Sequence, residues 1–341
     1  MQTLPVGKLR AETLQSFLGK YAPQDERVVV GPRIGEDAAV IDMGDRYLLA
    51  TTDPITFVTE KLGWYALQVN ANDLAVRGAR PRWFLATLLL PGGSATETMV
   101  EQLFAQLGQA CEELGVSLVG GHTEVTAGLD RPLVVGTMLG EIPKDRLITT
   151  GGAQVGDMML LTKGVPVEGT AIIAREREAE LLRRGVPAAL IERAKELLHR
   201  PGISVVPEAM LAAGLAPVHA MHDPTEGGVA TALWELAVAS AVGLRVERQR
   251  ISVLPEGERL CQEFGLDPLG TIASGALLLT LTPADATLVL HACAREGIPC
   301  AFIGQVVPRE QGVMLVEGSR ARPMPTFPQD EITKLFGESR L

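Results

Sequence analysis

The sequence has few of the features that mark disulfide miniproteins, membrane proteins or nucleic-acid-binding proteins. Its four cysteines stand singly, with no Cys-x-x-Cys and no neighbouring histidine, which argues against a disulfide framework or a zinc site. Bases are outnumbered by acids, 31 to 41, and no Lys/Arg-rich stretch could track a phosphate backbone. The longest apolar runs, 84–91 and 273–281, are far shorter than the ~20 residues that cross a bilayer. Neither a nucleic acid nor a membrane is therefore an expected partner.

The beginning of the chain lacks a basic segment followed by an apolar core, so no secretory signal is recognisable and a cytoplasmic location is expected. We interpret the cysteines as small buried hydrophobic residues. The length of 341 residues exceeds the roughly 100–200 of one typical domain, which predicts two domains with a sizeable core.

Short apolar runs alternate with helical patterns along the whole chain, separated by 36 glycines and 22 prolines, which predicts a mixed α/β architecture. In the first half, strands are expected at 28–30, 38–41, 47–51, 83–90, 117–119 and 133–139, with helices at 61–78 and about 95–114. In the second half, strands are expected at 158–162, 243–247, 275–280 and 301–307, with helices at 169–184, 187–199, 205–213, 227–240 and about 284–296. The tail from Pro323 has three prolines and no periodicity, so it is expected to be partly ordered at best.

Four aspartates stand beside small residues at strand ends or inside an apolar helix. They lie in the segments Gly35-Glu-Asp-Ala-Ala, Thr51-Thr-Asp, Asn70-Ala-Asn-Asp and His222-Asp-Pro-Thr. A carboxylate removed from water without compensation is costly, so buried acids generally pair with bases or coordinate cations. Oxygen ligands without cysteine or paired histidine favour Mg²⁺, which proteins often share with nucleotide phosphates. The pattern therefore makes these aspartates candidate magnesium ligands.

A structural interpretation stays open for each aspartate taken alone. Asp37 and Asp53 could be turn residues, Asp73 an internal cap, and Asp223 the N-cap of the following helix. This interpretation weakens for the set, because three polar side chains share one apolar helix where Ala or Leu would be preferred.

Few bases lie near the four segments in sequence: Lys61, Arg77 and Arg80. Arg77 is one helical turn beyond Asp73, where it could form a surface pair with that aspartate. Divalent cations therefore remain the better explanation for the aspartates.

Two glycine pairs indicate places where backbone N–H groups could approach an anion. Gly120-Gly-His-Thr123 follows an apolar strand and is a candidate phosphate-binding turn, with a plain tight turn as the alternative. Thr225-Glu-Gly-Gly228 precedes a helix start, which places N–H donors at the positive end of the helix dipole. Neither a Walker A sequence nor a GxGxxG after a strand occurs.

Three other polar residues have two interpretations each. His122 and His222 lie within the polar turns and could transfer protons or make structural hydrogen bonds. Lys163, in Leu161-Thr-Lys-Gly, could contact phosphate, but a solvent-facing lysine at a strand end is the preferred interpretation.

Five motifs in one order resemble the aminoimidazole ribonucleotide (AIR) synthetase superfamily. They are Gly-Glu-Asp-Ala-Ala-Val (35–40), Thr-Thr-Asp (51–53), Asn-Asp-Leu-Ala-Val-Arg-Gly-Ala-Arg-Pro (72–81), Gly-Gly-His-Thr (120–123) and His-Asp-Pro-Thr-Glu-Gly-Gly-Val-Ala (222–230). The resemblance spans about residues 31 to 310. Members include thiamine-monophosphate kinase, selenophosphate synthetase, formylglycinamidine synthetase and a hydrogenase maturation factor that dehydrates a carbamoyl thioester.

The resemblance implies a two-domain α/β (α+β) fold. Residues 1–152 would form an ATP-binding and dimerisation domain whose strands build a β-barrel with a second copy, and residues 153–341 an α/β sandwich. It implies that ATP and Mg²⁺ bind, with metal ligands at Asp37, Asp53, Asp73 and Asp223. Catalytic roles would fall to Asp73, His222 and Asp223. The nucleotide would be bound by Asn72, Gly120, Gly121, His122, Thr123, Thr225, Gly227 and Gly228.

Different motifs of the chain resemble different members of the superfamily. Residues 62–70 look like thiamine-monophosphate kinase, whereas 222–228 and 266–270 look like the hydrogenase maturation factor. The chain ends in Gly-Glu-Ser-Arg-Leu, without the terminal cysteine that carries that factor's substrate, and lacks selenophosphate synthetase's early Cys or selenocysteine with its following Lys. His122 stands where the kinase usually has Asp, which puts one metal position in doubt unless Glu124 substitutes for it.

The resemblance thus implies a homodimeric, Mg-ATP-dependent enzyme acting on a carbonyl, carbamoyl or amide-type or other small-molecule acceptor. Its nearest relative would be the hydrogenase maturation factor. A thiamine-monophosphate-kinase-like small-molecule kinase is the first alternative. A non-catalytic nucleotide-binding dimeric scaffold is the second.

Overall fold

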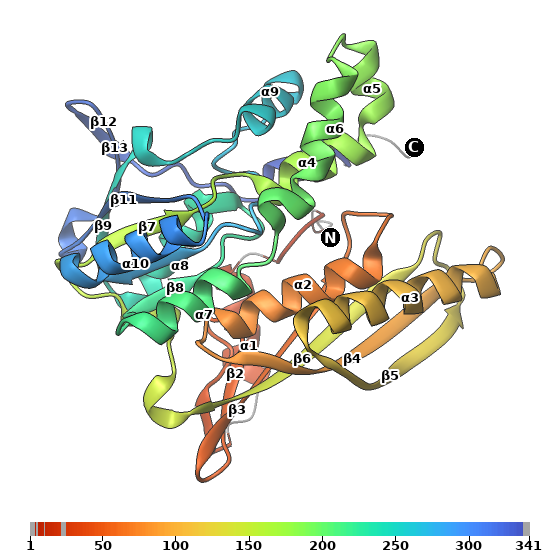
Figure 1. Ribbon diagram of the computed structural model, residues 1–341, viewed down its shortest axis with the longest axis horizontal. Coiled ribbons are helices and arrows are strands. Elements are labelled where there is room, and N and C mark those ends of the chain that lie inside the picture. Colours follow the sequence, from red (N-terminus) through yellow and green to blue (C-terminus); the bar gives the residue numbers. More distant parts are fainter. Residues whose placement is uncertain (1–3, 5, 10, 22–24, 337–341) are drawn as a thin grey trace. The chain divides into compact units, whose positions relative to one another are not determined.

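The computed structural model describes residues 4, 6–9, 11–21 and 25–336. The chain divides into two compact units. The first unit comprises Asp25–Gly31 and Asp37–Leu147, and the second comprises the described parts of Met1–Gln24, Pro32–Glu36 and Ile148–Leu341. Each unit is a sheet covered by helices, which confirms the mixed α/β architecture (Figure 1).

The first unit is built on a six-stranded sheet in the order β1-β2-β3-β6-β4-β5. Its elements are β1 (Val28–Val30), β2 (Ala39–Asp42), β3 (Arg46–Ile55), α2 (Leu62–Ala75), β4 (Arg80–Pro91), α3 (Glu97–Leu114), β5 (Ser117–Thr126), β6 (Leu133–Pro143) and the 3₁₀ turn η1 (Lys144–Arg146). All neighbouring strands are antiparallel except β4 and β5, which are parallel and joined by α3.

Helices α2 and α3 lie on one face of this sheet (Figure 1). Strand β4 shows why: Phe84, Ala86, Leu88 and Leu90 are buried, whereas the residues between them are only half-buried. Helix α3 begins at the N-cap Thr96, whose hydroxyl accepts a hydrogen bond from the Met99 N–H. The period-two pattern therefore leaves the second sheet face without a covering helix.

The expectation of a turn at Gly120–Thr123 is wrong, because these residues lie inside strand β5. The pairing with β4 shifts between Phe84 and Leu85, and Gly121 has a φ of 143°. A Cβ atom at Gly121 would lie 1.9 Å from the Ala86 carbonyl oxygen, so only glycine allows β4 and β5 to approach there. The glycine serves strand packing rather than a tight turn.

We predict that Gly121→Ala destabilises the first unit by roughly 2–4 kcal/mol, because the new methyl group overlaps the β4 backbone. Urea unfolding followed by circular dichroism measures this. Gly120→Ala is the matched control, since a Cβ atom there meets only Leu85 Cδ2 at 3.8 Å. Equal stability of the two variants would contradict this account of Gly121.

The second unit contains a seven-stranded sheet in the order β13-β12-β9-β11-β7-β10-β8. Its strands are β7 (Met158–Thr162), β8 (Ala220–His222), β9 (Gly243–Glu247), β10 (Leu278–Leu281), β11 (Cys300–Val307), β12 (Val313–Glu317) and β13 (Arg320–Pro323). Its α-helices are α1 (Ala11–Tyr21), α4 (Val167–Glu176), α5 (Glu178–Arg183), α6 (Ala188–Glu196), α7 (Val206–Leu215), α8 (Gly228–Ser240), α9 (Pro255–Phe264) and α10 (Pro283–Arg295). Shorter helical turns are η2 (Thr150–Gly152), η3 (Leu198–Gly202), η4 (Arg248–Arg250), η5 (Arg309–Gln311) and η6 (Glu331–Leu335).

The core of this unit lies between α8 and the sheet. Val229, Leu233 and Leu236 of α8 share one cluster of buried residues with Met159 and Leu161 of β7. Leu160, on the opposite side of β7, is also fully buried, and α7 and α10 contact each other in this part of the unit (Figure 1). A strand buried on both faces is typical of a sheet between helical layers.

Several local expectations need correction. The helix expected at 169–184 is two helices, because Arg177 has a φ of −122° and interrupts the helical backbone. The expected strand 275–280 begins only at Leu278. The tail is more ordered than expected up to η6, whose residues Glu331–Thr333 are buried, and residues 337–341 lie outside the described part.

All four cysteines are free thiols, and three of them are buried, as interpreted from the sequence. None of the helices within residues 11–21 and 25–336 combines the length and the hydropathy that a bilayer crossing requires.

Candidate functional site

In the first unit, strand β3 and helix α2 bring together several of the polar residues singled out in the sequence. The Thr51 hydroxyl lies 2.6 Å from Asp73 Oδ2 and 2.8 Å from the Asp37 backbone oxygen. Asp73 is 3% exposed, so its carboxylate sits at the buried interface of helix and sheet. Because Thr51 and Asp53 are two residues apart on β3, their side chains face α2 from the same side of the sheet.

Asn70 fixes the backbone of Asp53. Its Oδ1 accepts a 3.0 Å hydrogen bond from the Asp53 N–H, and its Nδ2 donates to the Ala66 carbonyl at 2.8 Å. A Cβ atom at Gly136 of β6 would lie 2.5 Å from Asn70 Nδ2, so glycine makes the room that this amide needs. Asn72 is fully buried in the same helix.

Arg77 does not form the surface pair that the sequence suggests. Its side chain is fully buried, and Nη2 donates a 2.7 Å hydrogen bond to Asp37 Oδ2. The chain folds back after α2, so the guanidinium points to the segment before β2 rather than along its own helix. Asp37 thus has a buried positive charge beside one of its two carboxylate oxygens.

The residues of β5 lie apart from this group within the first unit. Strands β6 and β4 separate β5 from β3, a distance of about 14 Å at the usual strand spacing. His122 Nε2 lies 2.9 Å from Glu124 Oε2, and both side chains are exposed. The hydrogen bonds from His122 and Thr126 hold the pKa of Glu124 below its ordinary value. Gly120, Gly121, His122 and Thr123 therefore form an exposed sheet edge.

In the second unit, Asp223 follows β8, the last strand of the sheet, and opens the turn into α8. Asp223 and His222 are buried, at 1% and 2% exposure. His222 Nε2 lies 2.9 Å from Glu235 Oε2 on α8, so the imidazole is anchored between strand and helix. The sequence signalled the aspartate and the histidine but not Glu235, the partner of His222, which lies 13 residues further along the chain.

The start of α8 is occupied by the chain's own carboxylate. The Gly227 N–H, expected to face a phosphate, donates a 2.6 Å hydrogen bond to Asp330 Oδ2, and the Gly228 N–H donates to the Thr225 carbonyl. Asp330 Oδ1 accepts from Ile332 N–H at 2.8 Å. Burial raises the pKa of Asp330 to about 7, even though these N–H donors favour the ionised form.

Glu168 on α4 is a second buried acid in this unit, with 6% exposure. Burial raises the pKa of Glu168 to about 7; a hydrogen bond with Ser274 opposes this, while the charges of Asp330, Glu226 and Asp223 add to it. Neither Glu168 nor Asp330 was a candidate from sequence. Their partners are distant in the chain, so no local pattern reveals them.

Lys163 is neither solvent-facing nor placed as a phosphate contact. It is 9% exposed, and its ammonium lies 2.9 Å from Glu208 Oε1 and donates to the Ser204 and Gly202 carbonyls. Its φ of 58° turns the chain directly after β7 and directs the side chain inward. Lys163 is therefore a structural ion-pair residue.

Family comparisons agree with the two-unit fold. The N-terminal domain of AIR synthase related proteins matches residues 35–142, and the C-terminal domain of the same family matches residues 154–317. The chain belongs to the AIR synthase related family. A carbamoyl dehydratase HypE from Cupriavidus necator is 31% identical over 287 residues, covering 81% of this chain and 78% of its own.

Two solved structures show the same AIR synthase fold. One is the hydrogenase maturation protein HypE in complex with ATP, with a TM-score of 0.70, 24% identity and coverage of 96% of this chain and 98% of that chain. The other is the thiamine monophosphate kinase ThiL complexed with AMPPCP and TMP, with a TM-score of 0.71, 22% identity and coverage of 92% and 96%.

The donor chemistry of this AIR synthase related chain fits a hard divalent cation. Asp53 and Asp73 offer carboxylate oxygens; Asn70 holds the Asp53 backbone, and Thr51 holds the Asp73 carboxylate. Mg²⁺ prefers such oxygen ligands and usually keeps part of its coordination sphere for water or phosphate. In the second unit Asp223 has the same character as a buried carboxylate beside a glycine-rich turn.

The raised pKa of Glu168 predicts how the free energy of unfolding changes with pH. An acid whose folded-state pKa lies above its unfolded value of 4.5 binds its proton more tightly when folded. Its contribution to stability is therefore complete below about pH 4.5 and is lost as the pH rises through about 7. The free energy of unfolding of the wild type should therefore fall between pH 5 and 8, and in Glu168→Gln this fall should be smaller by on the order of 1–3 kcal/mol.

Urea unfolding at several pH values measures this effect. Glu196→Gln, on the exposed side of α6, is the control and should keep the wild-type slope. A Glu168→Gln variant with the same pH slope as wild type would show that Glu168 is ionised in the folded protein.

Proposed function

We propose that the chain is a Mg-ATP-dependent enzyme that activates or phosphorylates a carbonyl, carbamoyl, amide or other small-molecule acceptor. The observation that carries this proposal is the pair Asp53 and Asp73 at the interface of β3 and α2, where Asn70 binds the Asp53 backbone and Thr51 binds the Asp73 carboxylate. The names of the relatives support it: a carbamoyl dehydratase at 31% identity, and folds of the same kind solved with ATP or AMPPCP.

In this proposal the first unit binds magnesium through Asp53 and Asp73, with Asp37 adjoining through its backbone contact with Thr51. Asp223 is proposed separately as a magnesium-binding carboxylate of the second unit. Bound magnesium would neutralise the charge of the triphosphate, which lowers the barrier to transfer of the γ-phosphoryl group to an acceptor oxygen. Asn70 holds the Asp53 backbone and Thr51 holds the Asp73 carboxylate, so both are positioning residues rather than catalytic ones.

His222 has a proposed role in proton handling near Asp223. Its imidazole is buried, and the Glu235 carboxylate orients it through Nε2. A fixed orientation is what a general acid or base requires. The hydrogenase-maturation type of reaction is preferred because it has the higher sequence identity, and a small-molecule kinase of the ThiL type is the second candidate because it has an equally good structural match.

Mg-ATP binding provides the first test. Isothermal titration should show saturable ATP binding in millimolar Mg²⁺ and at least tenfold weaker binding in EDTA. Asp73→Asn and Asp223→Asn should each weaken the Mg²⁺-dependent binding by about tenfold or more, because each removes one anionic ligand. Asp145→Asn, an exposed aspartate in η1, is the control and should bind as wild type.

Several outcomes separate the alternatives. Absence of ATP binding would contradict both enzymatic proposals, and wild-type affinity in either variant would remove that residue from the ligand set. Binding without ADP release in the presence of carbamoyl or alcohol acceptors would favour the scaffold.

We also propose a homodimer formed through the first unit. Strand β5 is an edge strand exposed along Ser117–Val125, and its Leu118, Val119 and Val125 are 40%, 53% and 63% exposed. The sheet face opposite α2 and α3 also presents half-buried apolar side chains, among them Leu85 and Val135. An exposed apolar edge and face are usually covered by another chain.

Val119→Lys combined with Val125→Lys should convert the dimer to a monomer, because both place charge on the exposed edge. Analytical ultracentrifugation measures the mass. Phe104→Lys, on an exposed position of α3, is the control and should remain dimeric. A monomeric wild-type protein, or a dimeric double variant, would refute the role of β5.

A further inference from the structure

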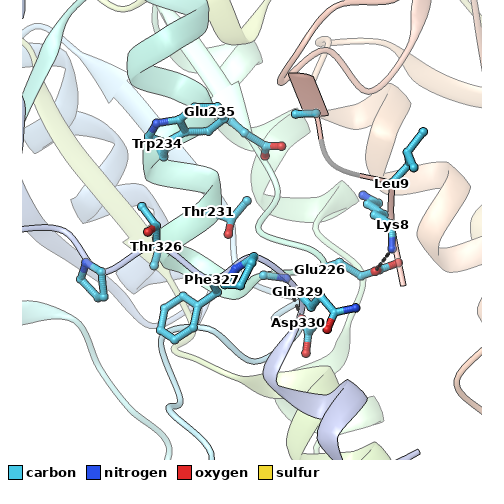
Figure 2. A pocket seen from close by; sticks show the side chains of 15 residues that line it. Lys8, Leu9, Glu226, Thr231, Trp234, Glu235, Thr326, Phe327, Gln329 and Asp330 are labelled. Atoms are coloured by element: carbon cyan, nitrogen blue, oxygen red, sulfur yellow. Dashed lines mark hydrogen bonds between the residues drawn. The ribbon is translucent and has the colours of Figure 1, made fainter. Parts of the chain in front are cut away.

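A cavity of about 580 Å³ lies in the second unit, between helix α8, the N-terminal segment and the segment before η6 (Figure 2). Gly227, Ala230, Thr231 and Trp234 line one side of it. Their spacing of three or four residues places them on one face of α8. The cavity is therefore formed by a regular element on one side and by two terminal segments on the other.

The walls suit a flat apolar group. Trp234 and Phe327 both line the cavity, and Pro325 and Pro328 lie within two residues of Phe327 in the sequence. The ring of Phe327 packs directly on Gly270, where a Cβ atom would come within 2.5 Å of it, and it joins the hydrophobic core of the unit. An anchored aromatic wall loses little conformational freedom when a planar ligand binds against it.

The polar groups of the cavity are mainly acidic. Glu226, Glu235 and Asp330 line it, and Lys8 is the only base among its described lining residues. The Lys8 ammonium donates a hydrogen bond to Thr225 Oγ1. Among the described contacts, Glu226 Oε2 accepts one hydrogen bond, which comes from the Lys8 backbone N–H. Negative charge in a partly enclosed apolar cavity attracts cations and repels anions more strongly than it would in water.

Two buried acids, Asp330 in the cavity wall and Glu168 interacting with it, have pKa values that burial raises to about 7, so their ionisation responds to a cation bound nearby. Asp330 is held by backbone N–H groups rather than by a base, and Glu168 Oε2 is a buried oxygen without a hydrogen-bond partner among the described residues. A ligand that brings positive charge would relieve the repulsion among these carboxylates.

We propose that this cavity binds a small organic cation, such as an amidinium, guanidinium or amine, attached to a flat apolar body. Given the function proposed above, this cation is the acceptor that the enzyme activates. Trp234 and Phe327 contact the flat body, and Glu226 binds the cationic end.

Three isosteric probes test the charge preference on the full chain without nucleotide. Benzamidine is a planar cation, benzamide its neutral counterpart and benzoate its anionic counterpart. Titration followed by calorimetry and by NMR shifts should give saturable binding of benzamidine, at least fivefold weaker binding of benzamide and no binding of benzoate. Absence of benzamidine binding, or benzoate binding as well as benzamidine, overturns the proposal.

Two variants separate the charge contribution from the apolar contribution. Glu226→Gln should weaken benzamidine about fivefold to tenfold and leave benzamide within about twofold, because it removes charge but keeps the acceptor oxygen. Trp234→Leu should weaken both probes alike. Glu247→Gln, an exposed acid paired with Arg250 in the same unit, is the control and should change neither. Equal loss of both probes in Glu226→Gln would refute a cation site.

The outcome is independent of ATP binding. If the protein binds benzamidine but not Mg-ATP, the cation site is supported and its role as the acceptor site is contradicted. If the protein binds Mg-ATP but not benzamidine, only the cation site is contradicted. Competition between benzamidine and AMP in EDTA would show that the cavity holds the nucleoside instead and would overturn the proposal.

Discussion

The constraint on which both units depend is the cost of holding carboxylates away from water. Two of the acids have a base beside them: Arg77 lies beside Asp37, and Lys163 lies beside Glu208. Glu168 and Asp330 are held instead by a hydroxyl and by backbone N–H groups, and burial raises the pKa of both. Glu168 and Asp330 therefore hold their protons more tightly than free carboxyl groups do, and a positive charge bound nearby would favour their ionised forms.

Each unit builds its polar site where the end of a strand meets a helix. In the first unit β3 presents Thr51 and Asp53 to Asn70 and Asp73 of α2. In the second, β8 ends at His222, which Glu235 of α8 anchors. In both cases side chains on regular elements are fixed by neighbours in the same unit. Precise placement of this kind is what phosphoryl-transfer chemistry requires, since much of its acceleration comes from positioning.

The family resemblance and the local geometry support each other at different levels. Membership in the AIR synthase related family rests on matches over both units. We propose that the choice of acceptor depends on the residues around the cavity, among them Glu226, Trp234 and Phe327. The fold can therefore be shared with a carbamoyl dehydratase and a thiamine monophosphate kinase while the acceptor differs from both.

The sequence alone determined the class of fold, most of the strands and helices, the superfamily and the aspartates that deserve attention, because these follow from periodicity and contiguous motifs. Only the tertiary structure decided that Gly121 serves strand packing, that Arg77 neutralises Asp37, and that Asp330 caps α8 from 103 residues away. These outcomes depend on which distant segments meet and how closely. A local pattern contains no information about either, because the free energy of a buried charge is set by neighbours that only the folded chain supplies.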